Sequence, residues 1–355
     1  MKNVRFILIL STLIAVFNSC STDVDLYADY KDIAIVYAIL DARADTNYIK
    51  ITRAFSGTND NPIYNANEVA LIADSSNYPG KLDARIIELK KSSGSDYAPT
   101  GRVMELDTIT LHNKEEGLFY APDQLFYYTT EKFKTGTIST RYQYRLVVVK
   151  PDGDSVSAQT SIVGNEEFEI LTTDVNFKKE PSGITKAILF RPDAAASLYE
   201  VTMQFNYSEQ KVGQEMQHKN VSHSFGTKAS WEYSNAAGNL YSQSYPINWL
   251  FTALEKAIGG DTIVNPNHPN VVRYIDDFVI SISAGGKELN TYYYTNQAQM
   301  ETPTSLVYVY TNIDGGYGLF SSRTTIQKVV RISANTEREL FGTFSWGFKE
   351  HSFIK

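Results

Sequence analysis

The hydrophobic pattern begins with a short basic stretch followed by a nearly unbroken apolar run. Lys2 and Arg5 precede the apolar residues 6–17, and Cys20 closes the run. This layout is typical of a secretory signal peptide, and the run is too short to cross a bilayer as a permanent helix. Because a small residue stands directly before the cysteine, the pattern predicts a lipoprotein cleavage site, with residues 1–19 as signal peptide and Cys20 as the lipidated residue.

Two other interpretations of this segment are an ordinary cleaved signal peptide that leaves a free thiol, and a retained anchor. Cys20 is the only cysteine of the chain, so it has no disulfide partner and lipidation is its simplest role. Phe17 and Asn18 differ from the most usual lipobox, which has Leu before two small residues. Ser21 follows the cysteine in place of Asp, and by the sorting rule of enteric bacteria this predicts an outer-membrane location. The lipid would anchor the chain stably there, on the periplasmic side or at the cell surface.

The first half of the mature chain carries the pattern of β-strands. Residues 33–40 are almost continuously apolar, which indicates a strand buried on both faces or placed in a sandwich core. Residues 48–55 alternate between apolar and polar. Residues 142–149 alternate in the same way, the turn residues 151–154 follow, and residues 156–162 return, which predicts a hairpin. Short strands joined by polar loops predict an immunoglobulin-like or fibronectin-III-like β-sandwich.

The pattern changes after Gly164–Glu167, the expected domain boundary. Residues 246–258 have apolar side chains at three-to-four spacing, with Pro246 suited to a first helical turn, and they predict a helix. Residues 288–300 are a second, shorter candidate helix, and strands are expected around both. The fold class is therefore mainly β. Its expected parts are a signal peptide 1–19, a lipidated tether 20–30, a β-sandwich 31–164 and a β-rich α+β domain 165–355.

The composition argues against nucleic acid as a partner and offers aromatic residues as candidates for a binding surface. The formal charge of -7 and the pI of about 5.4 argue against nucleic acid, because phosphate contacts need basic patches. The chain contains 24 Tyr and 18 Phe, which suits sheets with aromatic cross-strand pairs. Exposed aromatic rings also stack on sugars and anchor protein contacts, although core packing is the ordinary role of a Trp. The candidate binding surface consists of Trp231, Trp346, Tyr292, Tyr293 and Tyr294.

No residue pattern for catalysis, metal or cofactor binding stands out. The chain has no Gly-x-Ser-x-Gly, no His-Glu-x-x-His and no cysteine cluster. His218 and His223 lie in a polar stretch and are interpreted as exposed surface histidines. Asp276 and Asp277 are adjacent, so on a regular strand they would point to opposite faces and could not act as an acid–base pair. We therefore assign no catalytic residue, no metal ligand and no cofactor.

A glycine-rich stretch near the C-terminus has a structural interpretation. Gly315, Gly316 and Gly318 permit backbone angles that other residues avoid, which predicts a tight turn or bulge between strands. Leu319 and Phe320 would then re-enter a core. A phosphate-binding loop would need a helix directly after the glycines, whereas the following residues have an extended pattern.

Two stretches carry a family resemblance. Residues Ile35–Asp41 with Tyr48–Phe55, and the late segment Val307–Phe320, resemble a family of Bacteroidetes lipoproteins of unknown function. In that family a lipobox leads into a β-sandwich, and a segment of the type YSNIxGGxGxF lies near the C-terminus; Thr311 stands where the family more often has Ser. The family has no agreed catalytic residues, so none is transferred. Its members resemble accessory partners of TonB-dependent outer-membrane transporters, which implies such a transporter as partner.

The sequence thus favours a binding or accessory module over an enzyme. The lipid address, the sandwich pattern and the lack of a nucleophile or metal motif predict a non-enzymatic lipoprotein attached to the outer membrane through its anchor. An outer-membrane transporter is the expected protein partner, and a glycan or a peptide is the expected ligand class. The alternative is a hydrolase acting on a glycan or peptide, which would need two carboxylates facing each other across a cleft.

Overall fold

The structure, a computed structural model, describes most of the chain after the tether. The described residues are 32–54, 76–93, 96–112, 123–134, 142–180, 183–233, 235–236, 239–258, 271–301, 309–343 and 346–349. The predicted signal peptide, Cys20 and the tether lie outside these residues. No helix among the described residues has the length and hydrophobicity needed to cross a membrane.

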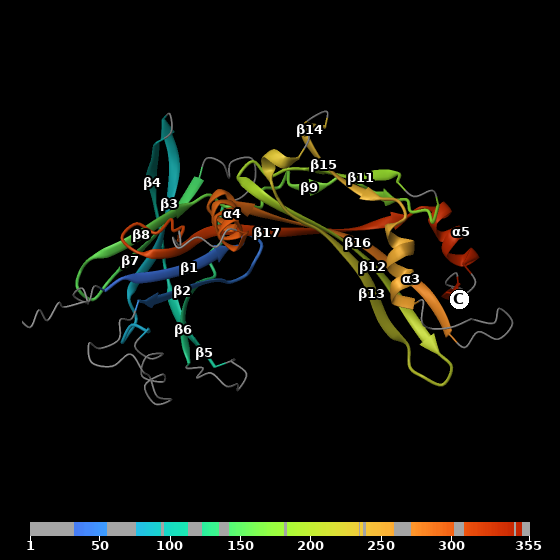
Figure 1. Cartoon of the computed structure of the whole chain (residues 1–355). Helices are drawn as coiled ribbons and strands as arrows, with labels where there is room; N and C mark the ends of the chain where they lie inside the picture. Colours follow the sequence, from blue (N-terminus) through green and yellow to red (C-terminus); the bar gives the residue numbers. More distant parts are fainter. Residues whose placement is uncertain are drawn as a thin grey trace, which may run out of the picture.

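The fold is mainly β, as predicted, and its first half is a sandwich of two sheets (Figure 1). One sheet contains the order β1-β2-β6-β5, and the other has the order β4-β3-β7-β8. With the strands lettered along the chain, these orders are A-B-E-D and C′-C-F-G, which is the immunoglobulin-type arrangement. The strands are β1 Ala34–Leu40, β2 Asn47–Arg53, β3 Asp83–Ser93, β4 Asp96–Glu105, β5 Asp107–Leu111, β6 Gln124–Thr129, β7 Tyr142–Val149 and β8 Ser155–Thr160.

The predicted hairpin is confirmed as β7 and β8. Tyr142, Tyr144, Leu146 and Val148 of β7 are buried, and the residues between them are half-buried. The turn closes with a hydrogen bond from the Lys150 N–H to the Asp154 carbonyl at 2.7 Å. Residues 33–40 face the sandwich core on one side only, because the burial of β1 alternates and leaves Tyr37 and Ile39 exposed. The expectation that this strand is buried on both faces is therefore wrong, and the sandwich-core alternative holds.

Glu88 of β3 places a carboxylate inside this first half and is 1% exposed. Its oxygens accept hydrogen bonds from Lys134 Nζ at 2.7 Å, Thr100 Oγ1 at 3.0 Å and Arg102 Nη1 at 3.2 Å. Burial raises the pKa of a carboxyl group, but the hydrogen bonds from Lys134 and Thr100 and the charge of Lys134 outweigh it. The pKa of Glu88 is therefore below its ordinary value.

We expect Glu88→Gln to lower the free energy of unfolding at neutral pH by roughly 2 kcal/mol, because the charge-assisted hydrogen bonds that Lys134 and Arg102 make to the buried carboxylate are lost. The folded-state pKa is depressed, so this stabilisation is present above the ordinary value of 4.5 and is lost as the pH falls through the folded-state pKa. Urea unfolding from about pH 7 to about pH 3 measures the difference in the free energy of unfolding between wild type and variant. This difference should become smaller only at acidic pH. An equal difference at pH 7 and pH 3 would contradict the lowered pKa of Glu88. Glu255→Gln, at an exposed position, is the control.

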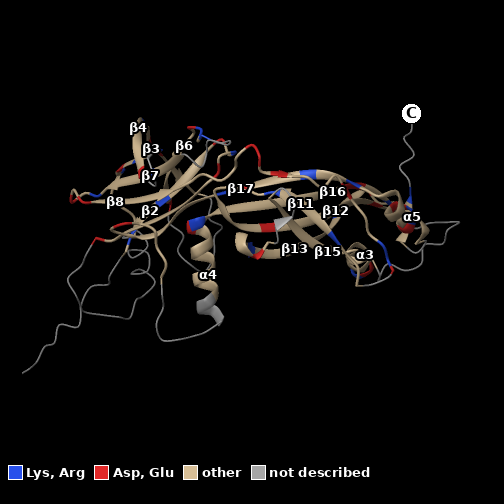
Figure 2. Ribbon diagram, turned by 90° about the horizontal axis from the view of Figure 1, so that it is seen from above, with Lys and Arg blue, Asp and Glu red and all other residues tan. Residues whose placement is uncertain are grey.

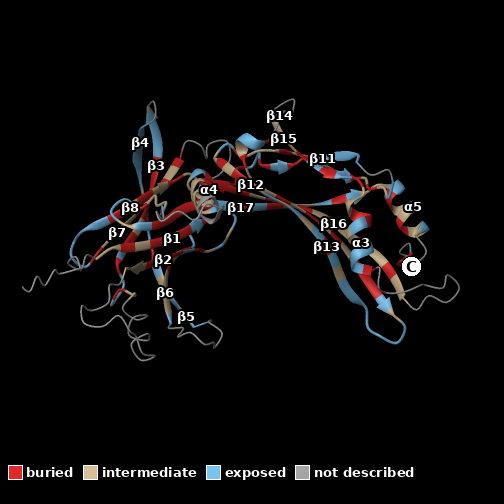
Figure 3. Cartoon of the chain, viewed as in Figure 1, coloured by how far each residue is buried: buried red, intermediate tan, exposed pale blue. Residues whose placement is uncertain are grey.

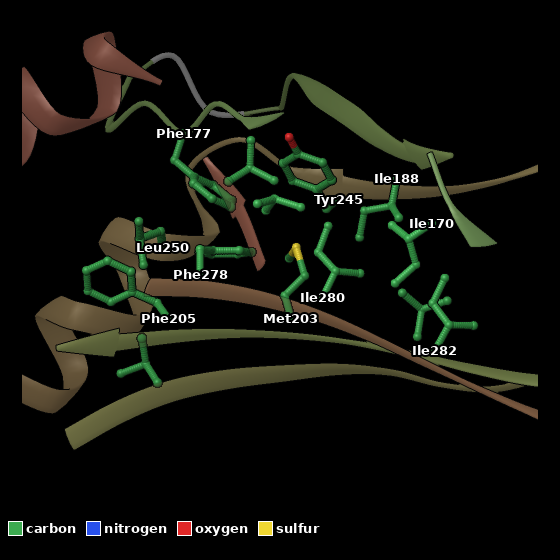
Figure 4. Packing of buried hydrophobic residues seen from close by; sticks show 14 of the residues in the cluster. Ile170, Phe177, Ile188, Met203, Phe205, Tyr245, Leu250, Phe278, Ile280 and Ile282 are labelled. Carbon is green, nitrogen blue, oxygen red and sulfur yellow. The ribbon is translucent and has the colours of Figure 1, made fainter. Parts of the chain in front are cut away.

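The second half packs a long sheet against a smaller one. The long sheet has the order β13-β12-β16-β17, and the smaller sheet has the order β14-β15-β11-β9. Figure 4 shows the core between them, where Ile170, Ile188 and Tyr245 face Met203, Phe278 and Ile280. The strands are β9 Glu169–Ile170, β10 Asp174–Val175, β11 Thr185–Arg191, β12 Ala196–Lys211, β13 Gln217–Ala229, β14 Asn235–Ala236, β15 Leu240–Pro246, β16 Val271–Gly286, β17 Tyr317–Ile332 and β18 Phe348–Lys349.

The helices lie at the ends and the middle of this second half. The predicted helix 246–258 is confirmed as α3, Trp249–Ile258, whose Leu250, Phe251, Leu254 and Ile258 are buried. Its predicted start is wrong, because Pro246 ends β15, where a strand tolerates a residue without an N–H. The candidate helix 288–300 is confirmed as α4, Lys287–Glu301. Helix α5, Ala334–Gly342, and the 3₁₀ turn η2, Ser230–Glu232, were not expected from the sequence.

Strand β17 joins the two halves. It pairs in parallel with β1, from Ile35↔Tyr317 to Leu40↔Ser322, and antiparallel with β16, from Gly285↔Arg323 to Phe278↔Val330. One sheet therefore runs through both halves, although each half has its own core, and the chain passes from the first core to the second between Ile162 and Val163. Figure 3 shows buried residues along β1 and β17, whereas the outer ends of β3–β4 and β12–β13 are exposed.

The glycine-rich stretch forms a turn before β17, as predicted. The turn places β17 against β1, a pairing that the sequence did not predict. Gly315 and Gly318 have positive φ angles of 76° and 119°. Gly318 lies so close to β1 that a Cβ atom there would stand 1.9 Å from the Val36 carbonyl oxygen. Leu319 and Phe320 are buried directly after it, which confirms their return to the core.

Candidate functional site

Helix α4 stands at the junction of the two halves and carries the predicted tyrosines. It begins where β16 ends, and Figure 2 shows it projecting from the sheet. The Leu289 N–H donates to the fully buried Ser321 Oγ of β17 at 3.1 Å. Gly285 leaves the space that the Leu289 side chain occupies, since a Cβ at 285 would lie 2.8 Å from it. The first turn of α4 is thus fixed to the sheet, and between Glu288 and Glu301 the helix has no charged residue.

On one side of α4 the structure brings three predicted residues together. The ring centroids of Tyr293 and Tyr294 are 5.3 Å apart, and those of Tyr294 and Trp231 are 5.8 Å apart. Trp231 belongs to η2 and is 69% exposed. The Tyr294 hydroxyl donates to Glu232 Oε1 and accepts from the Ala229 N–H at 3.0 Å, which fixes η2 against α4. Burial and the Glu232 carboxylate raise the pKa of Tyr294 to about 12, so it stays a neutral donor.

On the other side of α4, Tyr292 lies against the first half of the chain. It lies beside Tyr37 of β1, and burial together with the neighbouring Tyr292 hydroxyl raises the pKa of Tyr37. Further along the same face, the Tyr48 ring lies 6.5 Å from Phe126 and 6.3 Å from Tyr128, measured between centroids. We call the following set the aromatic surface: Trp231, Tyr292, Tyr293, Tyr294, Tyr37, Tyr48, Phe126 and Tyr128.

The sequence did not single out the part of this surface contributed by β1, β2 and β6. A signal was present, because Tyr37 and Tyr48 occupy strand positions that alternate with buried residues. An apolar residue at such a position belongs to the outer face of the sheet. The apolar run of residues 33–40 concealed this alternation.

Trp346 does not belong to the site, and its prediction as a binding residue is wrong. It is 6% exposed and stacks on Phe251 of α3, with ring centroids 6.0 Å apart. Its carbonyl accepts a hydrogen bond from the buried Arg273 Nη1 at 2.7 Å. Trp346 is a core residue at the far end of the second half, because α3 and β18 cover it.

A groove of about 150 Å³ lies between α4 and the outer face of the long sheet. Arg323 Nη2 is 3.8 Å from Glu200 Oε2 and donates to Ser283 Oγ at 3.1 Å. Glu200 also accepts from Ser224 Oγ at 3.0 Å. The groove therefore offers hydroxyl groups and a charge of each sign beside an aromatic wall, and it is lined by Leu198, Glu200, Ser283, Leu289, Tyr293 and Arg323.

The two histidines differ in their surroundings. His218 is an exposed surface residue, as predicted, with its side chain 80% exposed. His223 is half-buried against Trp249, with ring centroids 5.7 Å apart, and burial lowers its pKa, so the prediction of surface exposure is wrong for this residue. Its position on β13 turns it toward the second core.

Ser208, His218 and Asp276 lie together without forming a catalytic triad. Ser208 Oγ is 2.8 Å from both carboxylate oxygens of Asp276 and 3.0 Å from His218 Nδ1. Asp276 Oδ2 is 3.4 Å from that same Nδ1. In a triad the acid and the serine meet opposite nitrogens of the imidazole, so that the proton can pass through the ring. Within the described ranges, no group of three or more His, Cys, Asp or Glu side chains is placed to hold a metal.

Comparisons with known proteins leave the family open. No protein-family model matches the chain, and no curated protein matches it. Among solved structures, the solution structure of AT1g01470 from Arabidopsis thaliana aligns with 9% identity over 49% of this chain and 87% of that chain. Its TM-score is 0.15, a value too low to carry an argument about fold or function.

Proposed function

We propose that this chain is a lipid-anchored binding module of the outer membrane, which acts without catalysis as an accessory subunit of a transporter. The observation that carries the proposal is the aromatic surface on η2, on α4 and on the sheet beside them. Its Trp231, Tyr37 and Tyr48 are exposed, and its other rings are half-buried. Contiguous exposed apolar patches are rare on monomeric proteins and mark interaction sites. Interface centres are enriched in Tyr, Trp and Phe and depleted of charge, as α4 is.

The position of the surface supports a partner at the membrane. Strand β1 carries Tyr37 and begins at Ala34, a short distance after the proposed lipid at Cys20. Residues 20–33 span at most about 50 Å when fully extended. A standard interface of ~800 Å² per partner needs a surface of several side chains, and the aromatic surface extends from η2 across α4 to β6. We therefore propose a TonB-dependent transporter as the partner.

The groove beside Tyr293 supports a ligand role in the same module. Its hydroxyl groups, its Glu200–Arg323 pair and its aromatic wall suit a glycan or a peptide held by hydrogen bonds and stacking. A hydrolase is the alternative function. Of the described residues that line the groove, Glu200 is the single carboxylate, whereas retaining and inverting glycosidases use two.

The test of the proposed function is capture of a partner from native outer membranes by the full-length lipidated chain, combined with a glycan and peptide turnover screen. We expect a stable complex with an outer-membrane transporter and no turnover. Turnover that one carboxylate or histidine substitution abolishes, in a variant that stays folded, would replace the binding function by the hydrolase.

The lipid anchor has its own expected result. Palmitate labelling should place lipid on Cys20, because the lipoprotein signal ends there. Cys20→Ala should remain unprocessed or leave the membrane fraction, while Ser21→Ala, beside it, should still be labelled. A wild-type protein found soluble and unlabelled in the periplasm would contradict the anchor.

A further inference from the structure

The long sheet forks at the end opposite to α4 (Figure 1). Strand β17 pairs with β16 as far as Phe278↔Val330 and then pairs with β10 through Arg331 and Ile332. Strand β18 takes the place beside β16, but only at Arg273 and Tyr274. Among the described strands, none pairs with Ile275–Asp277 on this side. The gap opens into a hollow of about 530 Å³, which we call the fork hollow.

A β-bulge turns two carboxylates of the fork hollow to the same side. The register passes from Asn206↔Asp277 to Tyr207↔Ile275, so Asp276 is the extra residue. Asp277 Oδ1 accepts from Asn206 Nδ2 at 2.6 Å, and Asp276 accepts from Ser208 Oγ at 2.8 Å. Asn206 and Ser208 are two residues apart on β12 and share a face. The expectation that Asp276 and Asp277 point to opposite faces is therefore wrong, because the bulge breaks the alternation.

Charges of both signs line the fork hollow without neutralising one another. Arg331 lies at the end of β17, Lys349 lies on β18, and Glu337 lies on α5. Their side chains form no hydrogen bond or ion pair within the part of the chain that the structure describes. Two cations and three carboxylates thus face one cavity, where a ligand with both an ammonium and a carboxylate group would pair with them.

The rest of the lining is apolar and backbone. Val329 is 64% exposed, and Phe341 of α5 forms part of the wall. The edge of Ile275–Asp277, with which no described strand pairs on this side, spans roughly 10 Å, enough for about three residues of an added strand. A sugar lacks the charges, a nucleotide is repelled by three carboxylates, and a polyamine has no partner for Arg331 or Lys349. A short peptide with free termini matches the charges, the apolar wall and the open strand edge together.

From this geometry we infer that the fork hollow is a second binding site, which takes short peptides of two to four residues with free termini. The peptide lies beside Ile275–Asp277 as an added strand. Its ammonium group meets Asp277 and Glu337 at the end of the gap next to β17, and its carboxylate meets Lys349 at the end next to β18. The volume of the hollow falls within the range of small-ligand sites, which is about 300–1,000 Å³. This inference is independent of the aromatic surface, which lies around α4 at the other end of β17.

The test is equilibrium dialysis of the mature chain against a pool of tripeptides with free termini, with the retained peptides measured by mass spectrometry. A pool acetylated at the N-terminus and amidated at the C-terminus is the matched ligand control. We expect retention of the free pool and about tenfold less retention of the blocked pool, because the charge-assisted hydrogen bonds are lost. No retention of the free pool, or equal retention of both pools, would overturn the inference.

Variants locate the site. Lys349→Gln and Asp277→Asn should each reduce retention of the free pool about tenfold, while their unfolding transitions show that they fold. Glu337→Gln, on α5, provides a second variant if Asp277→Asn fails to fold. Arg338→Gln, on the exposed side of α5 and outside the lining, is the control and should retain peptide as the wild type does. Unchanged retention by both Lys349→Gln and Asp277→Asn would exclude the fork hollow as the peptide site. Capture of a transporter by the aromatic surface should be unaffected in these variants. The failure of the peptide site can therefore be distinguished from the failure of the proposed function.

Discussion

Trp231→Ala is expected to weaken capture of the outer-membrane partner by about thirtyfold. Truncating an exposed aromatic anchor of an interface costs about 2 kcal/mol, which corresponds to this factor. Trp231 is the most exposed ring of the aromatic surface, and its contact with Tyr294 presents it in one orientation. Surface plasmon resonance with the purified partner, or quantitative capture from membranes, measures the change.

The fold should be unaffected, because the exposed ring contributes little to the core. The control is Val212→Ala, which removes an even more exposed apolar side chain, 78% exposed, at the turn between β12 and β13 far from α4 (Figure 3). We expect wild-type capture by this control and intermediate capture by Trp231→Phe, which keeps a smaller ring. Wild-type capture by Trp231→Ala would show that the partner binds elsewhere, and the aromatic surface would lose its proposed role.

Gly318→Ala is expected to lower the free energy of unfolding by roughly 4 kcal/mol. Two costs add: a side chain at a φ of 119° is strained, and its Cβ would lie 1.9 Å from the Val36 carbonyl oxygen, so β1 and β17 must move apart. Because β17 is the strand shared by both halves, the variant should also separate their unfolding into two transitions.

Denaturant unfolding followed by tryptophan fluorescence and by circular dichroism measures both effects. All three tryptophans lie in the second half, so fluorescence reports that half whereas circular dichroism reports the whole fold. Gly342→Ala, where no atom lies within 4 Å of an added Cβ, is the matched control and should be neutral or slightly stabilising. Wild-type stability of Gly318→Ala would contradict the tight β1–β17 contact.

The protein holds its charged side chains in two different ways. In the first half the buried Glu88 accepts hydrogen bonds from Lys134, Arg102 and Thr100, and in the second half the buried Arg273 donates to the buried Glu209. In the second half, the fork hollow leaves Arg331, Lys349 and Glu337 without side-chain partners within the described ranges. Charges that are buried and paired specify a structure, whereas charges left unneutralised in a cavity are available to a ligand.

The sequence alone determined the local structure of this protein. The alternation of Tyr142, Tyr144, Leu146 and Val148 predicted β7, because one face of a strand is buried and side chains alternate with a period of two. The helical spacing of Leu250, Leu254 and Ile258 predicted α3 for the corresponding reason. The glycines before Leu319 predicted a turn, because only they adopt the required φ angles without strain.

Only the tertiary structure decided which of these local elements meet. Trp231 and Trp346 look alike in sequence, yet one is exposed beside α4 and the other is covered by α3 and β18. The bulge at Asp276 and the parallel pairing of β1 with β17 likewise have no local signal. A local pattern shows which face of a helix or strand is buried. It does not show which distant strand pairs with it or which helix covers a given ring, because these depend on how the whole chain packs.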